Sequence, residues 1–116
     1  MQSELIIEAA IEALEDIKAR DIETIDVRGK STVTDYMLVA SGTSKRHVVS
    51  IAAQVTDTFK EKGLLPIGSE GQASGDWVLV DFGDVVVHVL TQESREFYQL
   101  EKLWRFDPAL ESERTA

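Results

Sequence analysis

The residues best suited to catalysis in this 116-residue chain are three aspartates, Asp76, Asp81 and Asp84. Two carboxylates on one face of a strand can hold a magnesium ion for phosphoryl or nucleotidyl transfer. Such a site also needs a small-residue turn before a helix to receive phosphate, and residues 41–44 (Ser-Gly-Thr-Ser) offer one. The spacing argues against the metal pair, because Asp81 and Asp84 are three residues apart across an expected hairpin turn. A magnesium-dependent nucleotidyltransferase-like enzyme using Ser41, Asp81 and Asp84 is therefore kept as the alternative interpretation.

The two histidines and the lack of cysteine limit other kinds of chemistry. His47 lies at the start of an expected helix and His88 lies in an apolar strand, and they do not have metal-ligand spacing. The sequence contains no Gly-x-Ser-x-Gly elbow for a serine triad and no Gly-Lys-Ser/Thr phosphate loop. A lone strand histidine such as His88 is typically packed and hydrogen-bonded. We therefore predict no catalytic residue, no metal site and no cofactor.

Aromatic residues are concentrated in the last forty residues, and acidic residues surround them. These aromatic residues include Trp77, Phe97, Tyr98, Trp104 and Phe106, and the acids near them include Glu70, Asp76, Glu93, Glu96 and Glu101. Tryptophan and tyrosine dominate the binding energy of many protein interfaces. Phe97 is expected to pack on the sheet. The other rings, rimmed by carboxylates, predict a binding surface for a basic protein.

The net charge indicates which classes of partner the chain can bind. Twelve basic against twenty-one acidic residues give −9 at pH 7 and an isoelectric point near 4.6. This charge opposes direct contact with nucleic acid or with anionic lipid, and it favours a basic protein partner. No apolar run approaches the roughly 20 residues that cross a bilayer, and the first residues are acidic where a signal peptide is basic. We expect a cytoplasmic protein.

The hydrophobic pattern predicts an α/β fold. Ser3 and Ser44 are the expected N-caps of the first two helices, and residues 68–75 are an expected flexible loop. The expected helices span residues 4–19, 45–62 and 94–103, and the expected strands span residues 22–27, 35–40, 64–67, 77–82 and 85–90. Because the last two strands form a hairpin while a β–helix–β crossover favours parallel neighbours, we expect a mixed sheet of about five strands flanked by helices.

Four blocks of sequence, in the right order and at the right spacing, resemble the ribosomal silencing factor family, also called Iojap-like. They are DYMLVASGTS (35–44), Gly68-x-Glu70-Gly71, WVLVDFGDVVVH (77–88) and REFYQLEKLW (95–104). The resemblance implies a nucleotidyltransferase-like fold without catalytic carboxylates. It also implies one Iojap-like domain over residues 1–106, with residues 107–116 as a flexible tail.

The resemblance further implies a non-enzymatic repressor of translation. Its partner would be ribosomal protein uL14, a basic protein of the large subunit, whose occupied surface can no longer join the small subunit. Neither direct nucleic-acid contact nor a membrane is required, and a homodimer remains an open alternative. The expected partner-binding residues are Glu70, Asp76, Trp77, Tyr98, Leu100, Glu101, Leu103 and Trp104.

Overall fold

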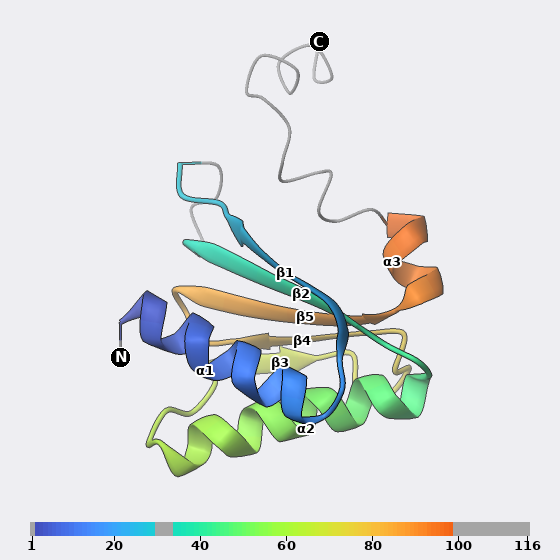
Figure 1. Ribbon diagram of the computed structural model, residues 1–116, viewed down its shortest axis with the longest axis horizontal. Coiled ribbons are helices and arrows are strands. Elements are labelled where there is room, and N and C mark those ends of the chain that lie inside the picture. The colour runs from blue at the N-terminus through green and yellow to red at the C-terminus, as the bar shows by residue number, and fades with distance from the viewer. Residues whose placement is uncertain (1, 30–33, 99–116) are drawn as a thin grey trace, which may run out of the picture.

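The computed structural model describes residues 2–29 and 34–98 as a single sheet with helices packed against it (Figure 1). In chain order the elements are α1 (Ser3–Asp16), β1 (Arg20–Asp26), β2 (Tyr36–Gly42), α2 (Lys45–Glu61), β3 (Gly68–Glu70), β4 (Trp77–Asp81), β5 (Val85–Thr91) and α3 (Gln92–Tyr98). The strand order is β1-β2-β5-β4-β3. β2 and β5 are parallel, and the other neighbouring pairs are antiparallel. The mixed five-stranded sheet expected from the sequence is confirmed.

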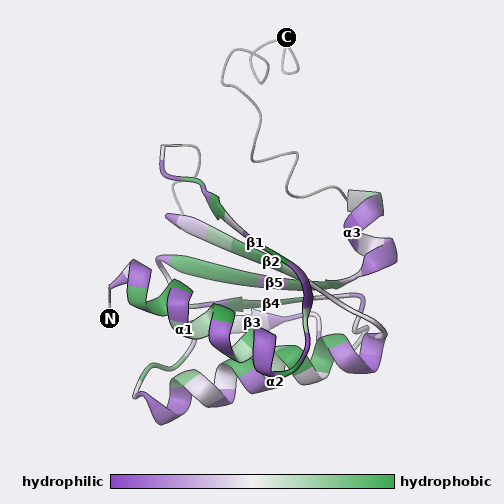
Figure 2. Ribbon diagram, in the orientation of Figure 1, coloured by the Kyte–Doolittle hydropathy of each residue, from purple (hydrophilic) through white to green (hydrophobic). Residues whose placement is uncertain are grey.

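Both long helices lie on the same face of the sheet, as Figure 1 shows. Each helix turns an apolar stripe inward, and α2 places Phe59 against Phe82 with ring centroids 4.6 Å apart. Figure 2 shows the central strand β5 coloured as hydrophobic, while both helices alternate between polar and apolar turns. Burial of these stripes against the sheet is the main source of the fold's stability.

The face opposite α1 and α2, called here the second sheet face, carries the alternate residues of the strands. Strand register and burial assign to it Glu23, Ile25, Met37, Val39, Ser41, Glu70, Trp77, Leu79, Asp81, Val86, His88 and Leu90. Several are buried, and they form a second apolar cluster of Ile25, Val27, Met37, Val39 and Leu90. α3 contacts β5 and β2. The second sheet face is therefore next to α3, whereas α1 and α2 pack on the other face.

Two local expectations, the N-cap of the first helix and the bounds of the third strand, were wrong. α1 begins at Ser3 itself, after Gln2, and no side chain caps it. The third strand is not residues 64–67 but Gly68–Glu70, inside the expected loop. Its three residues are all exposed, so no apolar alternation marked them, and pairing with β4 makes them a strand. By contrast, Ser44 caps α2 as predicted, because its hydroxyl accepts a hydrogen bond from the His47 N–H at 3.1 Å.

Among the described residues, no helix is long and apolar enough to cross a membrane.

Replacing Phe59 with alanine should lower the free energy of unfolding by about 3–5 kcal/mol, because it leaves a cavity beside Phe82. Urea unfolding measures the change. Gln54→Ala, on the exposed side of the same helix, is the control and should change stability by less than about 0.5 kcal/mol. Equal effects of the two substitutions would contradict the assignment of Phe59 to the core.

Candidate functional site

Trp77 is the aromatic residue of the second sheet face, at the first position of β4. Its side chain is partly exposed, and its indole packs against the second apolar cluster. The indole Nε1–H donates a hydrogen bond to Nδ1 of His88 at 2.9 Å. The two ring centroids are 5.8 Å apart with the ring planes tilted by 50°. The prediction that His88 is packed and hydrogen-bonded is confirmed. The donor of this hydrogen bond is Trp77, one of the predicted partner-binding residues.

Glycines set the position of Trp77 from the loop that precedes β4. The Gly75 N–H donates to the Gly71 carbonyl at 3.0 Å, which closes a turn. Gly71 has φ +97, and a side chain there would collide with the Trp77 carbonyl. After the turn, the Asp76 carbonyl accepts a hydrogen bond from the Thr91 N–H at 3.0 Å. Only glycine at position 71 lets the loop approach Trp77 this closely.

Two of the predicted acids are near Trp77, one on the neighbouring strand and one next to it in the chain. Glu70 is exposed on β3 and pairs with Leu79, so its side chain shares the second sheet face. Asp76 directly precedes Trp77 and forms a 3.7 Å ion pair with Lys45. Both side chains of this pair are about half exposed or more, and such pairs contribute little. Asp76 therefore remains accessible to a competing cation.

Arg95 fastens α3 to the second sheet face. Its side chain is only 10% exposed, and Nη2 lies 3.6 Å from a carboxylate oxygen of Glu23. Nη1 donates hydrogen bonds to Ser41 Oγ at 3.0 Å and to the carbonyl of Asp21 at 2.6 Å. Asp21 has a positive φ of 50° beside an irregularity in β1. Arg95 thus fixes the position of α3 against β1 and β2.

No role of Arg95 was expected from the sequence, and the prediction for Phe97 was wrong. Phe97 is 80% exposed and does not pack on the sheet as expected. Tyr98 is the last residue of α3. Leu100, Glu101, Leu103 and Trp104 lie outside the described residues, as does the expected tail 107–116. Of the predicted residues, the structure therefore places Glu70 and Trp77 on the second sheet face, whereas the Asp76 side chain pairs with Lys45 of α2.

The residues of the alternative enzyme do not converge. Ser41 pairs with Leu90 and Asp81 pairs with Val86, so they are separated by four residues along β5, about 13 Å. Ser41 is fully buried and accepts a hydrogen bond from Arg95. Asp81 accepts a hydrogen bond from the Gly83 N–H at 2.8 Å, which makes it a turn residue.

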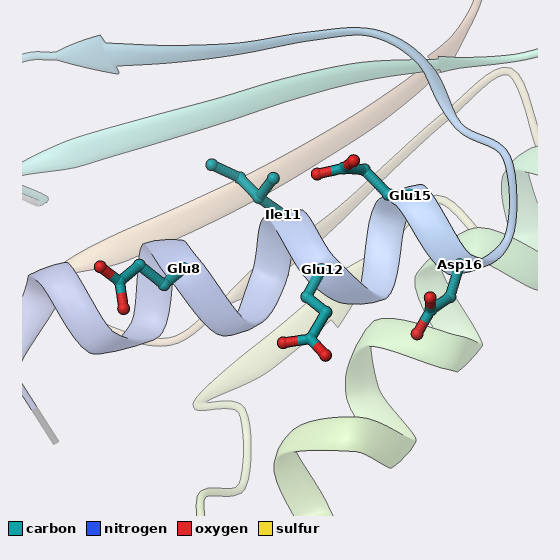
Figure 3. A pocket seen from close by; sticks show the side chains of 5 residues that line it. All are labelled: Glu8, Ile11, Glu12, Glu15 and Asp16. Carbon is teal, nitrogen blue, oxygen red and sulfur yellow. The ribbon is translucent and has the colours of Figure 1, made fainter.

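A groove along the outer side of α1 is the other acidic region. It is lined by Glu8, Ile11, Glu12, Glu15 and Asp16. Figure 3 shows Glu15 and Ile11 projecting from one side of the helix and Glu12 and Asp16 from the other. Within residues 2–29 and 34–98, no group of three or more His, Cys, Asp or Glu side chains could hold a metal ion. These carboxylates thus form a solvated helix face.

His47 is held by hydrogen bonds of its own. Its Nδ1 accepts from the Thr43 N–H at 2.9 Å, and its Nε2 lies 2.8 Å from the Ile17 carbonyl. The carbonyl can only accept, so the proton is on Nε2. His47 therefore links the end of α1 to the start of α2.

Comparison with known proteins identifies close relatives. A family model described as "Ribosomal silencing factor during starvation" matches residues 1–116. The ribosomal silencing factor of Chromobacterium violaceum is 47% identical over 104 residues, covering 90% of this chain and 85% of the relative. The one of Haemophilus influenzae is 42% identical over 99 residues, covering 85% and 97%. A crystal structure of a C. violaceum protein superposes with a TM-score of 0.88 at 46% identity, covering 92% of this chain and 89% of that one.

The stability of the fold should depend on the protonation of His88. Burial lowers the pKa of His88 from 6.5 to about 4, while the charge of Asp81 acts in the opposite direction. Between pH 6.5 and 4 the unfolded chain binds this proton and the folded chain does not. The free energy of unfolding should therefore fall as pH falls through this range, by up to about 3 kcal/mol from this group.

Urea unfolding of the native chain and of His88→Asn at several pH values between 7 and 4 measures this contribution. The stability difference between the two proteins should shrink toward pH 4, because the variant lacks the titrating group. A difference that stays constant with pH would contradict the assignment.

Proposed function

The chain belongs to the ribosomal silencing factor family, and from this we propose that it represses translation by binding ribosomal protein uL14. The bound chain blocks association of the large and small subunits by occupying the surface at which they meet. This function requires affinity and location, and it involves no chemical step. It places the protein in the cytoplasm as a non-enzymatic regulator.

The observation that carries this proposal is the surface around Trp77. An indole that is partly exposed and fixed by a hydrogen bond shares the second sheet face with the exposed carboxylate of Glu70, and Asp76 is its neighbour in the chain. An aromatic anchor with a polar rim is typical of a protein interface. The net charge of −9 attracts a basic partner and disfavours contact with ribosomal RNA.

The segment after α3 would complete this surface with Tyr98, Leu100, Glu101, Leu103 and Trp104. Its starting point supports this role. Arg95 ties α3 to Ser41, and both Ser41 and Trp77 are register partners of Leu90. Arg95 therefore attaches α3 to the row of the sheet that also contains Trp77. Together the two parts could reach the roughly 1,200–2,000 Å² buried by ordinary specific interfaces.

The separation of Ser41 from Asp81 favours this function over the alternative enzyme, which needs those groups at one metal ion. A homodimer built on the same aromatic surface would compete with ribosome binding. Light scattering over a dilution series distinguishes the two forms.

Adding the protein in excess to separated ribosomal subunits should lower the fraction of joined ribosomes, because the large subunit is then occupied. Sedimentation through a sucrose gradient measures this fraction, and the protein should migrate with the large subunit alone. Normal joining at saturating protein would contradict the proposed function.

Reversing the charge of Glu70 tests the surface without disturbing the core, because this side chain is exposed. Glu70→Lys should weaken binding to the large subunit, with a loss that diminishes as salt is raised. Glu12→Lys makes the same change on the opposite side of the sheet, on α1, and is the matched control. Equal loss from both variants would show that only net charge matters.

A further inference from the structure

We infer that His88 is a positioning residue for partner binding, which holds the Trp77 indole in the orientation that docks. It acts through Trp77, because its own side chain is only 8% exposed. The inference rests on the proposed function and deepens it. It assigns a role in recognition to a residue that, in an apolar strand, would otherwise be read as part of the core.

The geometry joins the two residues diagonally across β4 and β5. Trp77 is the register partner of Leu90, and His88 is the register partner of Leu79. Diagonal neighbours on one sheet face are within reach of large aromatic side chains. Because the rings are tilted by 50° with centroids 5.8 Å apart, they are not stacked face to face. The hydrogen bond from Nε1 to Nδ1 at 2.9 Å is a directional contact that favours one orientation of the indole.

The chemistry of position 88 also argues for a specific task. The nearby buried residues of the second sheet face, such as Val39 and Leu90, are apolar, and an apolar side chain at position 88 would pack there without the cost of burying an imidazole. Histidine supplies what they cannot, which is an acceptor for the Trp77 N–H. Burial keeps the ring neutral by lowering its pKa to about 4, so Nδ1 stays an acceptor while the proton is on Nε2.

A partly exposed tryptophan without this partner would sample other orientations and turn its N–H to water. Binding would then have to restrict those orientations, which costs affinity. An indole that is already held in the binding orientation avoids that cost.

Two substitutions of His88 distinguish the effect of the hydrogen-bond acceptor on binding from the effect of the ring shape. His88→Phe keeps an aromatic ring but has no acceptor, whereas His88→Asn places an amide oxygen close to the position of Nδ1. His88→Phe should weaken binding to the large subunit about tenfold, the value of one lost hydrogen bond. His88→Asn should stay within about threefold of the native chain, because it restores the acceptor.

The indole N–H resonance of Trp77 in ¹H–¹⁵N spectra gives a readout that is independent of binding. Trp77→Phe assigns this resonance. It should shift in His88→Phe and stay near its native position in His88→Asn. In the Trp77→Phe background, His88→Phe should cause no further loss of affinity, because the donor is already gone. Urea unfolding checks that each variant is folded.

Three affinity results would overturn the inference: native affinity in folded His88→Phe, lost affinity in folded His88→Asn, or a further loss from His88→Phe in the Trp77→Phe background. If His88→Phe does not fold, the affinity and the indole resonance of His88→Asn still decide. A native chain that fails to bind the large subunit overturns the proposed function instead. An indole resonance that is unchanged in His88→Phe shows, separately, that His88 does not hold Trp77.

Discussion

The parallel pairing of β2 and β5 at the centre of the sheet is the constraint on which the rest of the structure depends. Parallel neighbours need a crossover connection, and α2 provides it. α2 and α1 then lie together on one face, which leaves the second sheet face to β-strand side chains and α3. The surface that we assign to partner binding is therefore a consequence of topology. The helices stabilise the domain, and the opposite face is available for recognition.

Much of this fold could be predicted because its signals are local. The stripe on α2 from Val48 to Phe59 is fully buried, as its three- and four-residue spacing indicates. Gly83 and Asp84 predicted the hairpin between β4 and β5, and Gly83 has the positive φ of 89° that such a turn uses. β3 was not predicted, because its three residues carry no strand pattern of their own. Only its pairing with β4 defines it as a strand.

The site was only partly predictable, because its key contacts join residues far apart in the chain. The sequence singled out Trp77, Glu70 and Asp76 by residue type and by family resemblance. It could not show that His88 orients Trp77, since that depends on the diagonal register of two strands. It also could not assign Arg95, whose partners Ser41 and Asp21 are 54 and 74 residues earlier. A polar helix residue gives no sequence signal of such contacts.

The central claim is that the second sheet face, and not the helical layer, meets the ribosome. Site-specific photocrosslinking tests it, with a photoreactive amino acid in place of Leu79 on that face or of Gln54 on the exposed side of α2. We expect the probe at position 79 to attach to ribosomal protein uL14 of the large subunit, and the probe at position 54 not to attach to it. Attachment to uL14 from position 54 alone, or to other ribosomal proteins from position 79, would contradict it.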